Sequence, residues 1–210
     1  MEEIINNIIQ AEWEQFQRTQ NVGGRASCQN NYPQFYGMRY GQFAAWSVAV
    51  RLSYLNDLSR AREQGRNLVS EKYLRMMEFT FTDEYEGQKD NIPQLTHEHK
   101  FLADEICDQM ICQTIALQDT FPMLLRAGRP LRSSEDGYGT TSIQTYLRGE
   151  LYTYSIETLQ ALKEHLLNLQ AEGRSLSGEI LKHTVAYYGY KSLAAAEAAL
   201  RQQSECNGGQ

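Results

Sequence analysis

The sequence predicts an all-α fold, in which residues 1–210 form a single helical domain built from two pseudo-symmetric repeats. Apolar residues recur with helical spacing almost throughout, and no stretch alternates with a period of two for long enough to predict a strand. The second half of the chain also contains an internal repeat of the first, in which identical residues are separated by a constant offset of 108 positions. The identical pairs match Gly41, Ser47, Leu58, Gly65, Arg66, Leu68 and Glu71 with Gly149, Ser155, Leu166, Gly173, Arg174, Leu176 and Glu179.

The first repeat, about residues 2–81, has the order helix, long polar loop, long helix, short helix. Its predicted elements are a helix over 2–18, a polar loop over 21–31, a long helix from Pro33 to Gly65 and a short helix capped by Ser70. Proline is tolerated in the first turn of a helix, glycine commonly ends one, and serine is a favoured N-cap. The first helix rests on an apolar stripe formed by Ile5, Ile8, Ile9, Trp13 and Phe16.

The second repeat, about residues 97–188, follows the same order. Its predicted elements are a helix over 97–120 capped by Thr96, a loop over 121–140, a long helix over 141–170 with a stop at Gly173, and a short helix that ends near Tyr188. An Ala-rich helix over 192–201 and a frayed tail over 202–210 complete the expected domain.

Gly41 and Gly149 occupy equivalent interior positions of the two predicted long helices, where glycine costs ~1 kcal/mol relative to alanine. A close crossing of these two helices near a pseudo-twofold axis would compensate, because a missing side chain lets backbones approach. The alternative is a local kink at each glycine.

Composition and charge exclude several classes of protein. The net charge of −6, with scattered Lys and Arg, argues against duplex nucleic acid as a partner. No apolar run approaches the ~20 residues of a membrane span, and the acidic N-terminus does not resemble a signal peptide, so we expect a cytoplasmic protein that does not bind membranes. The hydrophobic share of 41% predicts a folded core.

No motif identifies a metal or a cofactor, so the cofactor is unknown. The four cysteines, Cys28, Cys107, Cys112 and Cys206, lack zinc-site spacing. The two imidazoles of His97 and His99 point to different sides of a helix, so no metal site is expected there.

A polar stripe on the long helices is the first candidate site. Arg39 and Gln42 share the helical face of Trp46, and the second repeat has Glu150 and Tyr154 at the positions of Gln42 and Trp46. A buried carboxylate needs partners, which Arg39 or Arg148 could supply. These residues either form a satisfied polar layer that fixes how the halves pair or lie on the floor of a pocket.

The two long loops add arginine, hydroxyl and carboxylate groups. The first holds Arg25, Ser27, Cys28 and Gln29; the second holds Arg129, Arg132, Ser133, Ser134, Glu135 and Asp136. If both loops reach the polar floor, they enclose a cavity suited to a carboxylate or phosphate. The alternative is that Arg132 pairs with Glu135 or Asp136 and only makes the loop rigid.

Two sets of site residues follow. The expected ligand-binding residues are Arg25, Arg39, Gln42, Trp46, Arg129, Arg132, Ser134, Tyr146, Arg148 and Tyr154. As catalytic candidates, Glu135, Asp136 and Glu150 could act as acid or base, and Cys28 lies near Arg25, which could lower its thiol pKa.

Several segments together resemble an uncharacterised bacterial family of unknown function, DUF4125. They are residues 24–28, 38–40, 71–78, 128–136, 146–150 and 188–191. Similar domains occur joined to a nucleotidyltransferase-like domain, so the resemblance implies an anionic, nucleotide-related ligand.

Three functional hypotheses remain. The leading one is a helical domain, either a binding module or an enzyme, that binds a small anionic molecule between the repeats. The second is an accessory subunit that docks on a catalytic, nucleotidyltransferase-like protein through its outer helical face, which predicts an exposed apolar patch. The third is a thiol-dependent enzyme that uses Cys28 with Glu135 or Glu150.

Overall fold

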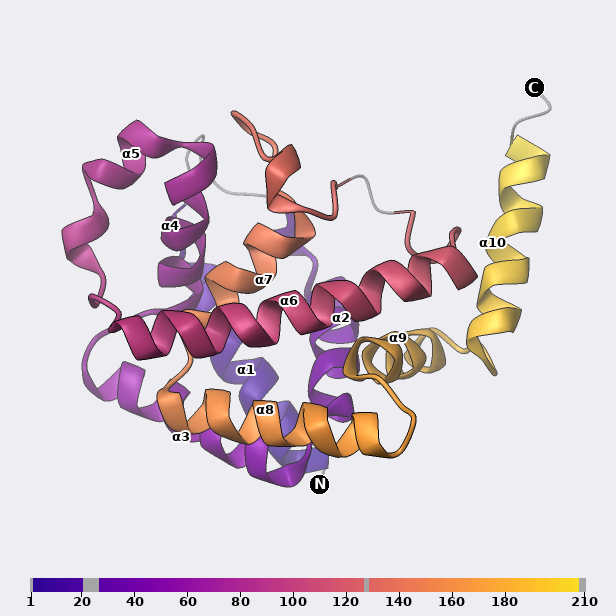
Figure 1. Cartoon of the computed structure of the whole chain (residues 1–210), viewed down its shortest axis with the longest axis horizontal. Helices are drawn as coiled ribbons and strands as arrows, with labels where there is room; N and C mark the ends of the chain where they lie inside the picture. The colour runs from indigo at the N-terminus through magenta and orange to yellow at the C-terminus, as the bar shows by residue number, and fades with distance from the viewer. Residues whose placement is uncertain (1, 21–26, 127–128, 208–210) are drawn as a thin grey trace.

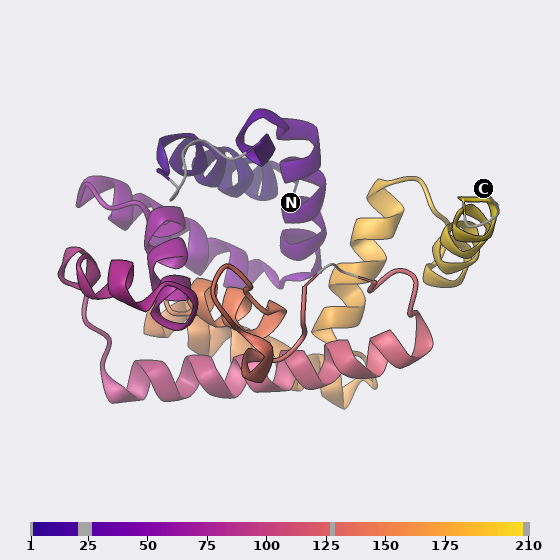
Figure 2. The same cartoon turned by 90° about the horizontal axis from the view of Figure 1, so that it is seen from above.

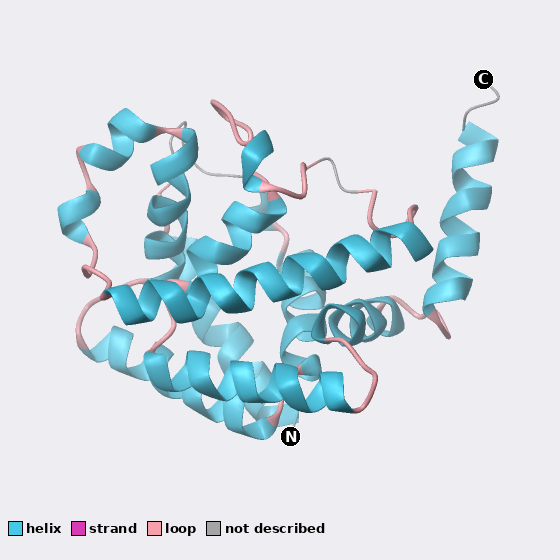
Figure 3. Ribbon diagram, in the orientation of Figure 1, coloured by secondary structure: helices cyan, strands magenta, loops and turns pink. Residues whose placement is uncertain are grey.

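The computed structural model describes residues 2–20, 27–126 and 129–207, and within these ranges it contains helices and loops but no strand (Figure 3). The all-α prediction is therefore confirmed. The α-helices are α1 (Glu2–Arg18), α2 (Tyr32–Ala45), α3 (Val48–Glu63), α4 (Leu68–Thr80), α5 (Thr82–Glu86), α6 (His97–Thr120), α7 (Ile143–Leu151), α8 (Ile156–Ala171), α9 (Leu176–Tyr187) and α10 (Leu193–Asn207). Short 3-10 turns occupy Ser27–Asn30, Lys89–Asn91 and Ser133–Glu135.

The prediction of one long helix in each half is wrong, because a serine starts a new helix in the middle of each. Trp46 is extended, with ψ 149°, and Ser47 then caps α3 by accepting a hydrogen bond from the backbone N–H of Val50. Ser155 caps α8 in the same way, accepting from the N–H of Thr158 at 3.2 Å. The side-chain caps satisfy N–H groups that a break would otherwise leave unpaired.

Several other predicted boundaries agree with the structure, but α10 continues to Asn207, beyond the end expected at residue 201, and one predicted cap is wrong. The bounds of α1 and α6 are those expected, with Thr96 capping α6. Gly65 and Gly173 end their helices with φ of 68° and 70°, a conformation that favours glycine. Asn67, and not Ser70, caps α4.

The helices of the two halves interlock. Figure 2 shows α1 and α6 on opposite sides of the molecule, while α2 packs against α9, α4 against α7, and α3 against α8. Within each half, α1 contacts α2, α3 and α4, and α6 contacts α7, α8 and α9. This correspondence is what a pseudo-twofold arrangement would produce, and the repeat itself stays a prediction. Helix α10 projects to one side in Figure 1 and packs on α9.

The glycines allow close helix packing, but not the crossing of the two long helices that was predicted. A Cβ on Gly41 would collide with the Thr184 side chain and lie 3.2 Å from the Ile180 carbonyl oxygen, both on α9. A Cβ on Gly149 would lie 2.8 Å from Met76 Cγ on α4. Each glycine therefore faces the short helix of the other half.

A continuous apolar core fills the space between these pairs. Its largest buried side chains include Phe43, Trp46, Tyr54, Ile106, Leu159, Leu162 and Leu166. Next to this core, a group of buried charged side chains, Glu12, Lys72 and Glu150 among them, lies where α1, α2, α4 and α7 meet.

Candidate functional site

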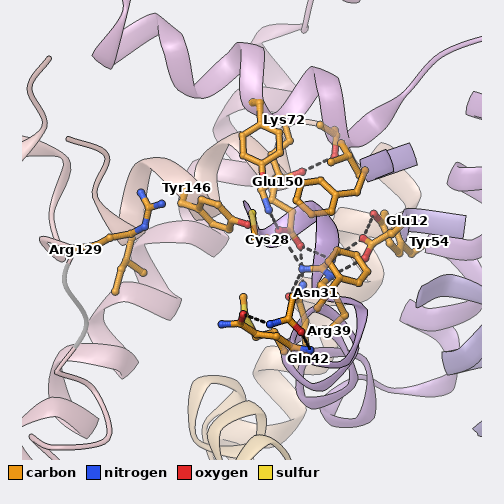
Figure 4. Close-up of a pocket in the computed structure, with 18 residues that line it drawn as sticks. Glu12, Cys28, Asn31, Arg39, Gln42, Tyr54, Lys72, Arg129, Tyr146 and Glu150 are labelled. Atoms are coloured by element: carbon orange, nitrogen blue, oxygen red, sulfur yellow. Dashed lines mark hydrogen bonds and ion pairs between the residues drawn. The ribbon is translucent and has the colours of Figure 1, made fainter. Parts of the chain in front are cut away.

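A cavity of about 450 Å³ opens where α1, α2, α4 and α7 meet (Figure 4). Its apolar walls come from Phe16, Phe35, Met38, Val69, Tyr73, Ile143 and Tyr146. Its polar lining comes from Glu12, Cys28, Asn31, Gln34, Arg39, Gln42, Tyr54, Lys72, Arg129, Glu150 and Thr153. We call the group formed by Glu12, Arg39, Gln42, Lys72 and Glu150 the floor of the cavity. The floor contains charged side chains of both signs, and the walls are mainly aromatic and aliphatic.

Arg39 is the centre of the floor. Its Nε and Nη2 donate to the two carboxylate oxygens of Glu12, both at 2.6 Å. Its Nη1 donates to Gln42 at 2.7 Å, and Nη2 donates to Glu150 at 3.0 Å. Every nitrogen of the guanidinium group is therefore engaged within the protein, and Arg39 is not available to hold an anion.

Glu150 is the second carboxylate of the floor. It accepts hydrogen bonds from Lys72 Nζ at 2.6 Å, Gln42 Nε2 at 2.8 Å and Tyr154 Oη at 2.7 Å, as well as from Arg39. Burial raises the pKa of Glu150, but Arg39 and Lys72 outweigh burial and hold this pKa well below the ordinary value of 4.5. Glu150 is therefore ionised.

Two buried tyrosines complete the network as donors. Tyr54 donates to Glu12 at 2.7 Å, as Tyr154 does to Glu150. Burial, and then the nearby carboxylate, raise the pKa of each tyrosine well above its ordinary value of 10.0. Both hydroxyls keep their protons and stay donors.

The floor carries no net charge, because Glu12 and Glu150 balance Arg39 and Lys72. Its members come from α1, α2, α4 and α7 and so bridge both halves of the chain. Such a layer is satisfied internally, which supports the interpretation that it fixes how the halves pair.

Lys72 also contacts the aromatic wall. Its Nζ lies 3.6 Å from the centroid of the Tyr146 ring, in cation–π geometry. Burial lowers the pKa of Lys72, but Glu150 outweighs burial and the pKa is raised overall. The charged ammonium is not a nucleophile.

Arg129 differs from the cations of the floor. It is exposed, donates from Nη1 to the Thr141 carbonyl oxygen at 3.2 Å, and lies 5.8 Å from the Tyr146 ring centroid. In the view of Figure 4, Tyr146 lies between Arg129 and the Lys72–Glu150 pair. Arg129 has no carboxylate partner in the described part of the chain, so it gives the cavity one positive charge beyond the balanced floor.

Six of the predicted site residues come together around this cavity. They are Cys28, Arg39, Gln42, Arg129, Tyr146 and Glu150. Trp46 and Tyr154 lie behind the floor, packed edge to face with ring centroids 5.9 Å apart. Arg25 lies outside the described residues.

The remaining predicted residues serve local structure outside the cavity. Asp136 accepts hydrogen bonds from the Ser142 backbone N–H and the Thr145 hydroxyl, and so fixes the start of α7. Arg148 pairs with Asp104 at 2.9 Å.

Three other predicted residues of the second loop also lie outside the cavity lining. Arg132, Ser134 and Glu135 are exposed and do not line it. The expected ion pair of Arg132 with Glu135 or Asp136 is absent from the described residues; instead Glu135 accepts the backbone N–H of Arg132 at 3.3 Å.

The sequence interpretation missed Glu12 and Lys72. A signal for Glu12 exists, because it lies on the face of α1 that also carries Ile5, Ile8 and Ile9, and an acidic side chain on such a face needs a buried partner. The polar stripe of α2 could have been matched with it.

The described residues contain no cluster of three or more His, Cys, Asp or Glu side chains able to hold a metal ion. Among them, no helix has the length and apolar character needed to cross a membrane.

Comparison with known proteins gives a family but no activity. No curated protein and no solved structure matches the chain. A family model described as a protein of unknown function, DUF4125, matches residues 2–198, which is nearly the whole sequence. The chain therefore belongs to the DUF4125 family.

Proposed function

We propose that this domain binds a small anionic molecule in the cavity between α1, α2, α4 and α7. The observation that carries the proposal is the charge of Arg129, which has no carboxylate partner among the described residues and lies beside an aromatic wall, near a floor whose own charges cancel. Arginine without a carboxylate partner suits a carboxylate or phosphate, which it binds through two parallel hydrogen bonds.

The cavity also limits the body of the ligand. Its volume lies within the ~300–1,000 Å³ range of small-molecule sites, and its walls are mainly apolar. Phe16 and Phe35 stack with ring centroids 5.4 Å apart, and Tyr146 belongs to the same lining. These rings favour an apolar or aromatic body attached to the anionic group.

Binding, and not catalysis, is what the arrangement of the groups favours. Glu150 already accepts five hydrogen bonds and is held ionised, so it is a poor general base. Cys28 lines the cavity, but none of the described histidines does, so the thiol has no such base beside it.

Arg129→Gln is expected to weaken binding of the anionic ligand by about 10-fold or more, because a charge-assisted hydrogen bond contributes ~1.5–3 kcal/mol. A thermal-shift screen of phosphorylated metabolites, nucleotides, amino acids and aromatic carboxylates would find the ligand, and titration calorimetry would compare the variants. A ligand at 100 times its dissociation constant should add ~2.7 kcal/mol of stability.

Arg132→Gln is the matched control for this experiment. It removes the same charge from an exposed position of the same loop, outside the cavity. Equal loss of affinity in both variants would show that only the overall surface charge matters and would contradict the proposed site.

A second candidate function, docking on a protein partner, rests on a tyrosine face. We define the tyrosine face as Tyr32, Tyr187 and Tyr188, which are exposed, together with Tyr36 and Tyr40, which are half-buried. Its rings form a continuous series, with Tyr36 and Tyr187 centroids 5.8 Å apart and those of Tyr187 and Tyr188 5.3 Å apart. Tyrosine is enriched among the residues that dominate binding energy in protein interfaces.

Replacing both Tyr187 and Tyr188 by Ser is expected to reduce co-purification with a catalytic partner by about 10-fold, and to leave the affinity for the cavity ligand unchanged. Quantitative pulldown of wild type and variant would measure the first effect, and calorimetry the second. Unchanged partner recovery would remove the tyrosine face from consideration.

A further inference from the structure

A second cavity, of about 590 Å³, shares two lining residues with the first. Arg129 and Tyr73 belong to both linings. The two cavities are therefore neighbours that meet at these two side chains.

The chemistry of the second cavity differs from that of the first. Its lining includes Arg18, Asn67, Ser70, Gln88, Asn91 and Thr141, whereas Leu74, Met76, Met77, Phe81 and Ile92 form its apolar part. It lacks the balanced floor of Arg39, Lys72 and two carboxylates. Hydroxyl and amide groups thus accompany its cations.

The second cavity has more cationic than anionic character. Glu71 is its one acidic lining residue among those described, and Arg66 already neutralises Glu71 through two hydrogen bonds of 2.8 and 2.7 Å. Arg18 donates from Nε to the Glu14 carbonyl oxygen at 3.2 Å and has no carboxylate partner in the described ranges. Among the described lining residues, Arg18 and Arg129 are therefore the two cations whose charge no carboxylate cancels.

Arg129 is held at the junction of the two cavities. Its Nη1 is fixed on the carbonyl of Thr141, which lines the second cavity, while its guanidinium carbon lies 5.8 Å from the ring of Tyr146, which lines the first. One face of the guanidinium group is thus near an aromatic wall, and its remaining N–H groups have no partner among the described residues.

We infer that the ligand spans both cavities and is a phosphorylated compound, with an apolar planar body in the first cavity and its phosphoryl group at Arg129 and Arg18. This inference rests on the proposed function and specifies the ligand class. A carboxylate is satisfied by one bidentate arginine, whereas a phosphoryl dianion carries three oxygens and twice the charge, which two arginines match.

Calorimetric titration of three probes tests the inference. The probes are 1-naphthyl phosphate, which has both parts, 1-naphthol, which has only the planar body, and inorganic phosphate. We expect 1-naphthyl phosphate to bind at least about 10-fold more tightly than either fragment, because linking two binding parts avoids a second loss of translational freedom.

The variant Arg18→Gln separates the two cavities. Arg18 is exposed and lines only the second cavity, so the variant should fold normally. The substitution is expected to lower the affinity for 1-naphthyl phosphate about 10-fold and to leave the affinity for 1-naphthol unchanged. Arg132→Gln again serves as the control for surface charge.

Alkylation of Cys28 gives an independent test of where the planar part of the ligand lies. The exposed Cys112 serves as the internal reference. Saturating 1-naphthol and 1-naphthyl phosphate should slow the reaction of Cys28 with iodoacetamide and leave Cys112 unaffected, because Cys28 lines the first cavity. Inorganic phosphate should protect neither thiol.

The outcomes separate this inference from the proposed function. If Arg129→Gln weakens the binding of 1-naphthyl phosphate and Arg18→Gln does not, the two-cavity inference is overturned and the anion-binding site at Arg129 stands. If neither variant differs from wild type, both fail. If wild type does not bind 1-naphthyl phosphate but binds another Arg129-dependent ligand, the phosphoryl assignment alone is overturned.

Discussion

Arg39→Met is expected to lower the free energy of unfolding by about 3–5 kcal/mol at pH 7, because it leaves two buried carboxylates without their shared cation. The side chains of Arg39 and Glu150 are only 11% and 6% exposed, so water cannot replace the lost hydrogen bonds. Urea denaturation of wild type and variant measures the difference.

The loss of unfolding free energy caused by Arg39→Met should depend on pH in a defined direction. The pKa of Glu150 is depressed in the folded protein, so its ion pairs contribute stability that is present above the ordinary value of 4.5 and is lost as pH falls through the lower folded value. The gap between wild type and Arg39→Met should therefore be largest near neutral pH and narrow below about pH 4.5.

Arg148→Met is the control for this prediction. Arg148 also forms a salt bridge on a helix of the same region, but its partner Asp104 is 40% exposed. Exposed pairs contribute ~0–1 kcal/mol, so this variant should lose about 1 kcal/mol or less. An equal loss in the two variants would contradict the view that the Arg39 network is the buried anchor of the fold.

The helical character of the chain could be predicted from its apolar period, but the breaks within the long segments could not. The period continues across Ser47 and Ser155, since Val50 and Leu159 are buried as expected for one continuous helix. Serine occurs within helices and also caps them, so the period alone does not reveal which role wins. Tertiary contacts decide that a new helix begins at each serine, because the change in the direction of the helix axis lets α3 and α8 pack on each other.

The candidate site could be predicted only in part, for a similar reason. Residues on the helical stripes, such as Arg39, Gln42 and Glu150, lie where the 3.6-residue period places them. Loop residues follow no period, and Asp136 is used as a local acceptor at the start of α7. The approach of Glu12 to Arg39 depends on how α1 and α2 pack, which no pattern in the sequence specifies.

Gly149→Val is expected to destabilise the protein by about 1–3 kcal/mol and also to weaken binding in the first cavity. A Cβ at this position would lie 3.1 Å from the Lys72 carbonyl oxygen, and backbone cannot move aside as a flexible side chain can. The branched valine adds two methyl groups to this contact, so α7 and α4 must separate.

The separation has a functional consequence, because Gly149 and Glu150 are neighbours on α7 and Lys72 lies on α4. Moving the helices apart lengthens the 2.6 Å contact between Lys72 and Glu150 and displaces Lys72 from the ring of Tyr146. Calorimetric titration with the cavity ligand should then show a fall in affinity alongside the fall in stability.

Gly87→Val provides the matched control, since a Cβ at Gly87 would meet no atom closer than 3.7 Å. This variant should change the free energy of unfolding by less than about 0.5 kcal/mol. The contrary outcome is that Gly149→Val loses stability but keeps its full affinity for the ligand. The cavity would then tolerate movement of α4. Arg129 would have to hold the anion without support from the Lys72–Tyr146 contact.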